Sequence, residues 1–375
     1  MSSYPPTQCG LATFTAALGQ SLCAEGDGSG FGVVRAVPAP AGDGGSDVVA
    51  ELVEGSPESR AEAAAALNDF DVVVIQHEYG IYGGPDGDEV LAVLDRLVVP
   101  VVVVLHTVLV HPSRHQREVL EHVLAHADAV VTMTRTARRR LLDASPIAAD
   151  KVFVIPHGAS EKLREGRGEE PGDGRPTVLT WGLLGPGKGL EWAIEALAEL
   201  KDLDPPLRYR IVGQTHPKVL EHHGDGYREG LVERARSLGV DDMVEFENDY
   251  LDTETLQGIV RDADVVLLPY DSEEQVTSGV LIEAVASGIP VVSTGFPHAV
   301  ELLSPGAGLL VGRKDPGAIA AALRRILTEE GLGGRMRDRA GEIGPDLLWQ
   351  SVAGRYRTIA EALLSPAARS THEVA

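Results

Sequence analysis

The fold is decided by residues 265–303, whose sequence is VVLLPYDSEEQVTSGVLIEAVASGIPVVSTGFPHAVELL. The stretch opens with an apolar run at residues 265–268, which has the length and composition of a strand buried on both faces of a parallel sheet. A polar loop follows at residues 271–277, and residues 280–286 then place apolar side chains on one helical face. A second apolar run at residues 290–294 completes a strand–helix–strand unit. This order predicts an open parallel sheet with helices packed against it.

The start of the predicted helix has the features of an anion-binding site. A helix that begins beyond the carboxyl end of a strand directs its free N–H groups and the positive end of its dipole away from the sheet. Ser278 is a suitable N-cap, and Gly279 has no side chain to keep a phosphate from the backbone. One turn further along, the carboxylate of Glu283 offers acceptors for the two hydroxyls of a ribose. The stretch therefore predicts a site for a nucleoside diphosphate.

The same residues, PYDSEEQVTSGVLIEAVASGIPVVST, resemble the donor-binding signature of the retaining GT-B glycosyltransferases of the family-4 type, also called glycosyl transferases group 1. That signature has a Glu, seven residues and a second Glu, and then an A-x-G-x-P-V-V run. Glu283 takes the place of the second Glu, whereas Gln275 stands where the family has the first. The resemblance implies an α/β protein of the GT-B class, with two doubly wound Rossmann-like domains facing a deep interdomain cleft.

The composition limits the classes of function. The chain has 375 residues, which exceeds the usual size of one domain, so two domains are expected. Its formal net charge of -23 argues against nucleic acid or an anionic membrane as the main partner. No uncharged apolar run is long enough to predict stable membrane insertion. Two cysteines, Cys9 and Cys23, are too few for a disulfide framework, so we expect a cytoplasmic protein; a homodimer stays open.

Strand–helix alternation recurs on both sides of residues 159–176, a charged and glycine-rich segment that is typical of a linker. We expect an N-terminal Rossmann-like domain on the acceptor side over residues 1–165 and a C-terminal nucleotide-sugar donor domain over residues 172–345. The resemblance implies that a final helix over residues 346–365 packs back on the first domain. Only three residues precede Tyr4, so the first strand is either vestigial or truncated by a misplaced start codon.

Polar residues follow apolar runs in the N-terminal half, where open α/β sheets place their ligands. His77 and Glu78 end one such run and are expected on the sugar or acceptor side, although Glu78 could instead cap the strand locally. His106 ends the run at residues 99–105, and the resemblance implies a catalytic position near the anomeric carbon of the transferred sugar. Gly10 precedes a helical pattern and belongs either to a donor-binding glycine loop or to an ordinary turn. The resemblance of PPTQCGLATF favours the donor loop.

A glycine-rich loop at residues 182–189, GLLGPGKG, has two glycines and a lysine at nearly the spacing of a P-loop. It is not the P-loop of an NTPase, because the residue after Lys188 is Gly where magnesium ligation needs Ser or Thr. The glycine spacing of a dinucleotide fingerprint is also missing, which disfavours an NAD-linked oxidoreductase. The loop resembles the family's GR-(x)4-KG loop, which makes Lys188 a catalytic cation at the diphosphate and places Gly185 and Gly187 beside the donor. The family's arginine falls on Leu183, a second departure.

Further site residues follow from the resemblance. Gly213 ends a predicted strand where relatives have G-x-G, and Tyr250 lies in the loop that contacts the base. Thr277 belongs to the donor side, next to the predicted cap. Gln275 is expected to contact the hydroxyls of the transferred sugar as a catalytic residue, and His298 is placed on the sugar or acceptor side.

We expect neither a metal nor a cofactor. Asp262 and Asp264 superficially match a D-x-D metal motif, but they lie at a helix end before a buried strand and are interpreted as structural. The predicted function is transfer of a mannosyl or glucosyl group from a nucleoside diphosphate sugar, such as GDP-mannose or UDP-glucose, to an acceptor hydroxyl with retention. Two alternatives stay open. One is a nucleotide-sugar epimerase of the same fold, and the other is a non-catalytic nucleotide-sugar binder, which the departures at Leu183 and Gln275 favour.

Overall fold

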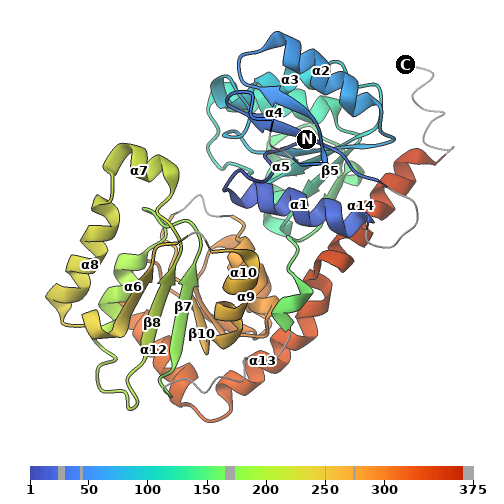
Figure 1. Ribbon diagram of the computed structural model, residues 1–375. Helices are drawn as coiled ribbons and strands as arrows, with labels where there is room; N and C mark the ends of the chain where they lie inside the picture. Colours follow the sequence, from blue (N-terminus) through green and yellow to red (C-terminus); the bar gives the residue numbers. More distant parts are fainter. Residues whose placement is uncertain (24–29, 43–44, 165–173, 250, 273–275, 366–375) are drawn as a thin grey trace. The chain divides into compact units, whose positions relative to one another are not determined.

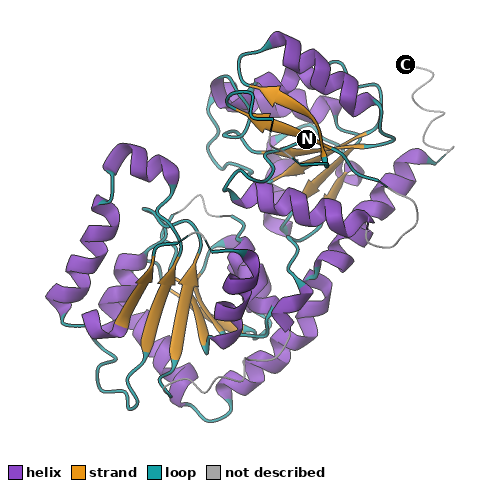
Figure 2. Ribbon diagram, viewed as in Figure 1, coloured by secondary structure: helices purple, strands orange, loops and turns teal. Residues whose placement is uncertain are grey.

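A computed structural model describes the chain except for residues 24–29, 43–44, 165–173, 250, 273–275 and 366–375 (Figure 1). The chain divides into two compact units. The first comprises Met1–Gly158 together with Trp349–Ala375, and the second comprises Ala159–Leu348. Each unit is an α/β body built on parallel strands, and each is described by itself below (Figure 2).

The second unit is built on one parallel sheet of six strands in the order β12-β11-β10-β7-β8-β9. The strands are β7 (Thr177–Trp181), β8 (Arg208–Val212), β9 (Val244–Glu247), β10 (Val265–Leu268), β11 (Val291–Thr294) and β12 (Gly308–Val311). The apolar runs at residues 265–268 and 290–294 predicted β10 and β11. They did not predict β12, which is a short edge strand with partly exposed residues.

Helices cover both faces of this sheet because successive strand residues point to opposite sides. Val265 and Leu267 join one hydrophobic cluster with α6 (Leu190–Leu197), α8 (Gly226–Leu238) and α12 (Pro316–Thr328). Val266 and Leu268 join the other cluster, which includes residues of four helices. These are α9 (Thr253–Asp262), α10 (Gly279–Ala286), α11 (Pro297–Leu303) and α13 (Leu332–Ile343).

The strand order creates a switch point between β7 and β10. The chain runs from β7 outward through β8 and β9 on one side, and outward from β10 through β11 and β12 on the other. In open α/β sheets, the crevice beyond the carboxyl ends of the two strands at such a point is where ligands bind. The loops that leave these two strands are residues 182–189 and residues 269–278, the same two loops that the sequence analysis singled out.

The helical segment between β8 and β9 is divided in two. The helices α7 (Pro217–His223) and α8 are separate. Gly224 lies between them with φ of +54°, a left-handed conformation that glycine adopts without strain and that ends a helix.

The first unit contains a parallel sheet in the order β3-β4-β5-β6 and a parallel pair, β1 and β2. The strands are β1 (Val33–Val37), β2 (Val48–Val53), β3 (Val73–His77), β4 (Val101–Leu105), β5 (Ala129–Thr132) and β6 (Val152–Val154).

Residues 1–2 link these two groups of strands. The Ser2 amide donates to the Val34 carbonyl (3.2 Å), and the Gln76 amide donates to the Met1 carbonyl (3.1 Å). The N-terminal residues thus occupy the place of a first strand, but they form only an isolated bridge.

The helices of the first unit are α1 (Gly10–Cys23), α2 (Pro57–Asn68), α3 (Glu89–Leu94), α4 (Arg114–His126), α5 (Arg135–Ala144) and α14 (Trp349–Leu364). Residues Val352 and Tyr356 of α14 pack in one hydrophobic cluster with Phe14 and Leu18 of α1. The last helix therefore belongs to the first unit although it follows the second in sequence.

The predicted linker begins inside the second unit. The Ala159 amide donates to the Leu347 carbonyl (2.8 Å), and Leu163 is buried in the cluster that contains α9 and α10. The boundary of the first unit therefore falls at Gly158, earlier than the expected residue 165, because residues 159–163 add apolar contacts to the second core.

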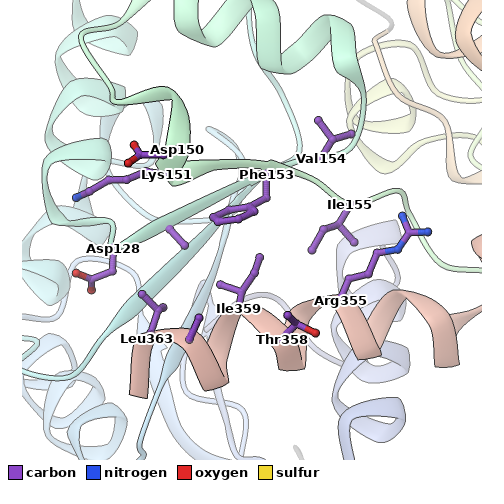
Figure 3. A pocket seen from close by; sticks show the side chains of 12 residues that line it. Asp128, Asp150, Lys151, Phe153, Val154, Ile155, Arg355, Thr358, Ile359 and Leu363 are labelled. Atoms are coloured by element: carbon purple, nitrogen blue, oxygen red, sulfur yellow. The ribbon is translucent and has the colours of Figure 1, made fainter. Parts of the chain in front are cut away.

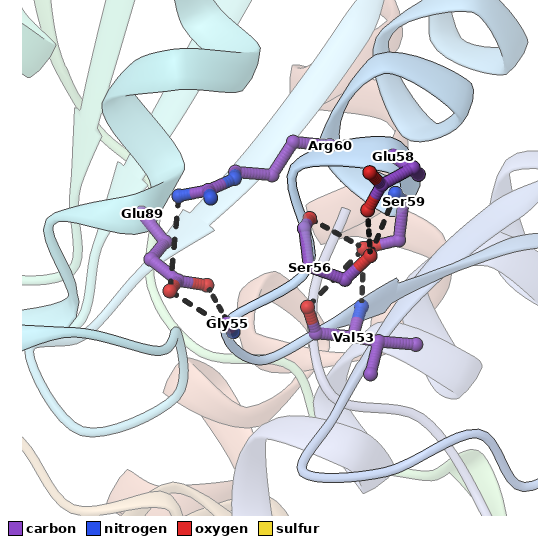
Figure 4. A network of polar contacts seen from close by, with 7 residues as sticks. All are labelled: Val53, Gly55, Ser56, Glu58, Ser59, Arg60 and Glu89. Carbon is purple, nitrogen blue, oxygen red and sulfur yellow. Dashed lines mark hydrogen bonds and ion pairs between the residues drawn. The ribbon is translucent and has the colours of Figure 1, made fainter.

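A polar network fixes the turn between β2 and α2 (Figure 4). The Ser56 hydroxyl accepts a hydrogen bond from the Ser59 amide (3.1 Å), which caps α2. The Glu89 carboxylate accepts hydrogen bonds from the Gly55 amide (3.0 and 3.1 Å) and lies 3.7 Å from Arg60. The first residue of α3 is thereby tied to the start of α2.

Candidate functional site

The loop at residues 182–189 leaves β7 and lies against the end of β10. A Cβ atom added to Gly189 would lie 2.0 Å from the Pro269 carbonyl oxygen, so only glycine permits this approach. The Gly187 carbonyl accepts a hydrogen bond from the Asp271 amide (3.1 Å). The two loops at the switch point are therefore joined through their backbones.

Tyr270 connects the lysine of the first loop to the helix that follows the second. The Lys188 Nζ atom lies 4.5 Å from the centre of the Tyr270 ring, within the range of a cation–π interaction. The Tyr270 hydroxyl is 3.4 Å from the Ser278 hydroxyl. Tyr270 is 1 % exposed, whereas Lys188 is only partly buried. The buried aromatic ring thus lies between the Lys188 cation and the residue that caps α10.

The N-terminus of α10 has the predicted cap. The Ser278 hydroxyl accepts a hydrogen bond from the Leu281 amide (3.2 Å). The Ser278 amide donates to Nδ1 of His298 (3.1 Å), so it is not available to a diphosphate. The amides of Gly279 and Val280 are the next two, and a helix leaves both without an intrahelical acceptor. The anion-binding groups of this helix therefore begin at Gly279.

His298 supports the loop at residues 276–278 through hydrogen bonds. It is 4 % exposed, and its own amide donates to the Val276 carbonyl (3.2 Å). The ring and the backbone amide of His298 thus hold residues 276–278, and its place on the sugar or acceptor side stays a prediction.

Glu283 lies one turn into α10 and bonds to the end of β7. The Trp181 indole N–H donates to the Glu283 carboxylate (3.1 Å). Burial raises the pKa of Glu283 to about 7, and the hydrogen bond from Trp181 opposes this shift without cancelling it. The side chain keeps partial solvent exposure. Near neutral pH, Glu283 therefore exists in both protonation states.

The other predicted donor residues have varied surroundings. Gly185 closes a turn by accepting a hydrogen bond from the amide three residues later (3.1 Å). Gly213 follows β8 with φ of +129°, and Thr277 is partly exposed beside the cap. Tyr250 and Gln275 lie outside the described residues.

In the first unit, His106 belongs to an aromatic cluster centred on Phe14. The centres of the His106, His157 and Trp349 rings each lie 5.0 Å from the centre of the Phe14 ring. His106 Nε2 lies 2.7 Å from Oε1 of Gln76. Since that oxygen can only accept, Nε2 carries the proton and Nδ1 keeps its lone pair. Gln76 and His157 were not predicted as site residues, although each stands near the end of a strand.

His106 and His157 of this cluster, and the nearby His77, are neutral at physiological pH. Burial, followed by the charges of His157 and His77, lowers the pKa of His106 to about 3. Burial lowers the pKa values of His77 and His157 to about 4. These rings can therefore exchange hydrogen bonds but carry no positive charge.

Three other predicted residues of this unit have the following surroundings. His77 is 1 % exposed and packs edge-on against Tyr79, so it supports the end of β3 and is not accessible to a sugar. Glu78 accepts a hydrogen bond from the Thr107 hydroxyl, which is the local alternative considered for it. Gly10 is exposed and begins α1.

A separate hollow lies elsewhere in this unit. A cavity of about 510 Å³ lies beside α14 and is lined mainly by apolar side chains such as Phe153, Ile155 and Ile359 (Figure 3). None of the predicted site residues lines it. Within the described part of the chain, no helix combines the length and apolar character that crossing a bilayer needs.

Comparison with known proteins gives two family matches. Residues 33–162 match the model described as Glycosyltransferase Family 4, and residues 175–329 match the model described as Glycosyl transferases group 1. The chain is 28 % identical over 267 residues to a D-inositol 3-phosphate glycosyltransferase of Corynebacterium glutamicum, aligning 66 % of this chain with 60 % of that protein. It is 32 % identical over 222 residues to the protein of that name from Acidothermus cellulolyticus, aligning 55 % of this chain with 47 % of the relative.

Solved structures share the fold. A glycosyltransferase from Rickettsia africae superposes with a TM-score of 0.74 at 15 % identity, covering 98 % of this chain and 100 % of that chain. Sucrose-phosphate synthase from Thermosynechococcus elongatus gives 0.71 at 20 % identity, covering 95 % and 94 %. Anabaena HepE in complex with UDP and glucose gives 0.69 at 18 % identity, covering 84 % and 87 %.

Proposed function

Because this chain belongs to the group 1, family-4 type of glycosyltransferases and has their GT-B fold, we propose that it transfers a hexosyl group from a nucleoside diphosphate sugar to an acceptor hydroxyl with retention. The resemblance drawn from residues 270–294 is confirmed at the level of the family. The donor sugar is proposed to be glucosyl or mannosyl, carried by UDP or GDP.

One observation carries the proposal most directly, which is the arrangement of Lys188, Tyr270 and the first turn of α10 at the switch point. When the bond between the sugar and the diphosphate breaks, negative charge grows on the leaving diphosphate. Fixed donors aimed at that charge lower the barrier more than they stabilise the bound substrate. Lys188 supplies a full charge, and the amides of Gly279 and Val280 supply oriented dipoles. We propose that these groups make transfer independent of a metal ion.

Two further roles complete the donor site. The Glu283 carboxylate accepts hydrogen bonds from the ribose hydroxyls, for which its ionised form is the better acceptor. Gln275 binds hydroxyls of the transferred sugar; its amide both donates and accepts, unlike the ionised Glu of the family pattern. In the first unit, the neutral His106 ring keeps a lone pair on Nδ1 that can accept a hydrogen bond from a sugar hydroxyl.

The acceptor class is proposed from the relatives' name. D-inositol 3-phosphate carries several hydroxyls and one phosphate on a single ring, and it is a suitable first acceptor to test. The relatives match this chain over only part of their lengths, so a panel of other polyols and sugar phosphates belongs beside it.

The deciding experiment incubates the protein with UDP-glucose or GDP-mannose, with and without the acceptor panel. Mass spectrometry then follows the released nucleoside diphosphate and the glycosylated product. A transferase forms both only when acceptor and donor are present, apart from slow hydrolysis. Conversion of the donor into an isomer without acceptor would indicate an epimerase. Tight nucleotide binding without turnover would indicate a non-catalytic binder, the alternative that Leu183 and Gln275 favour.

A further inference from the structure

A cluster of two imidazoles and one carboxylate lies in the first unit, apart from every residue assigned to glycosyl transfer. Asp95 caps the C-terminal end of α3, and His122 and His126 stand one turn apart on α4. Residues four apart share one face of a helix, so both imidazoles point the same way. The sequence indicates no metal cluster here. Asp95 is 27 residues from His122, and the packing of α3 against α4 brings the two together.

The ligand atoms of the three side chains converge on a small volume. His122 Nε2 lies 2.7 Å from Asp95 Oδ1, and His126 Nε2 lies 3.3 Å from the same oxygen. One ligand atom from each residue lies within 4.8 Å of both others. Around a tetrahedral zinc ion with bonds of about 2.0 Å, ligand atoms are about 3.3 Å apart. The cluster needs only small rotations to reach that spacing.

Hydrogen bonding orients the His126 ring toward the carboxylate. His126 Nδ1 lies 3.0 Å from the His122 carbonyl oxygen, which can only accept, so Nδ1 carries the proton. The other ring nitrogen, Nε2, faces the Asp95 carboxylate oxygen 3.3 Å away. A metal ion bound to both atoms satisfies this contact. A hydrogen bond from the outer ring nitrogen to a carbonyl is also the usual way in which metal-binding imidazoles are oriented.

We propose that Asp95, His122 and His126 form a surface site for a divalent first-row transition metal ion, with zinc as the first candidate. Imidazole nitrogen binds zinc, nickel and copper, whereas magnesium and calcium need mainly oxygen ligands. The side chains are 50 %, 38 % and 35 % exposed, so an ion enters from solvent and water completes its coordination. The bound ion links α3 to α4, and this assignment is independent of the proposed transferase activity.

His115 provides a matched control on the same helix. Its Nδ1 and Nε2 atoms lie 2.9 and 3.4 Å from Asp86 and Asp88, and its side chain is 42 % exposed. It therefore resembles the cluster in exposure and in its acidic partners, but within the described residues it belongs to no group of three convergent ligand atoms.

The test titrates untagged, chelator-treated full-length protein with zinc chloride by calorimetry. Wild type is expected to bind one equivalent at a site that His126→Ala and Asp95→Asn each weaken at least about tenfold, the scale expected when one of three ligands is lost. His115→Ala is expected to bind like wild type. Zinc should raise the melting temperature of wild type and His115→Ala but not of His126→Ala, because an ion that binds only the folded state stabilises it. Magnesium should have no effect.

Circular dichroism without zinc establishes that each variant is folded. The assignment is overturned if wild type and His126→Ala bind zinc equally, if wild type binds no stoichiometric zinc, or if His115→Ala removes the binding.

Discussion

The ammonium group of Lys188 lies 4.5 Å above the ring of Tyr270, and the hydroxyl of the same tyrosine lies 3.4 Å from the side chain that caps α10. Lys188 and Ser278 belong to different loops, and Tyr270 touches both from a buried position at the end of β10. The tyrosine thereby sets the spacing between a cation and a helix N-terminus, the two parts of the proposed diphosphate site.

Replacing Tyr270 tests this positioning role. Tyr270→Phe keeps the ring under Lys188 and removes the hydroxyl, whereas Tyr270→Leu removes the ring. A cation–π contact contributes about 0.5–2 kcal/mol, so Tyr270→Leu should lower kcat/KM for the donor about twofold to thirtyfold. Tyr270→Phe should retain most of the wild-type kcat/KM. Steady-state kinetics and urea unfolding of both variants separate the effect from simple loss of stability. Equal kinetics for the two variants would contradict a role for the ring.

Removing the ammonium group of Lys188 should lower the rate of transfer more than it lowers the stability of the fold. Lys188→Ala is expected to lower the rate of transfer at least about tenfold, which corresponds to about 1.4 kcal/mol of transition-state stabilisation. Lys162→Ala is the matched control, because Lys162 is an exposed lysine of the same unit. Single-turnover kinetics at saturating donor measures the chemical step. Near-normal turnover by Lys188→Ala would remove this residue from the mechanism.

His298 is expected to act through Ser278. His298→Ala leaves the buried Ser278 amide without its acceptor, and an unsatisfied buried donor costs about 1–3 kcal/mol of unfolding free energy. The freed loop should also raise KM for the donor while leaving kcat for bound donor largely unchanged. Urea unfolding and donor-dependent kinetics measure the two effects. A fall in kcat with unaltered stability would instead indicate direct contact with the sugar.

The layered α/β architecture was predictable because buried parallel strands are written as short apolar runs, as at residues 265–268. Features that depend on one backbone dihedral angle, or on the exposed edge of a sheet, were not predictable. The break at Gly224 needs φ of +54°, which composition does not reveal. Strand β12 has only four residues, and its side chains are partly exposed on the edge of the sheet.

At the site, local chemistry was predictable and long-range partners were not. Ser278 has the type and position of an N-cap, and the structure confirms that role. The hydrogen bond from Trp181 to Glu283 joins residues 102 apart, and His298 reaches Ser278 from 20 residues away. No sequence spacing specifies such contacts, because the sheet brings the ends of separate strands together.

Glu283 should make donor binding depend on pH. Its pKa of about 7 means that the carboxyl group is mostly protonated at pH 6 and mostly ionised at pH 8. If only the ionised form binds the ribose well, the donor Kd should fall about tenfold between these pH values, as single-site titration requires. The buried histidines, with pKa values of about 3 to 4, stay neutral throughout and do not contribute. Glu283→Gln should bind more weakly and without this dependence, as measured by calorimetry.

The same pKa fixes the direction in which the stability of the protein changes with pH. Folding raises the pKa of Glu283 from 4.5 to about 7, so between these values the folded state holds more protons than the unfolded state. This group's contribution to the unfolding free energy therefore decreases as pH rises through that window. Glu283→Gln should consequently stabilise the protein more at pH 8 than at pH 5. Trp181→Phe removes the hydrogen bond that favours the carboxylate, so it should move the midpoint of donor binding to higher pH. A midpoint that moves to lower pH would show that Trp181 does not stabilise the ionised form.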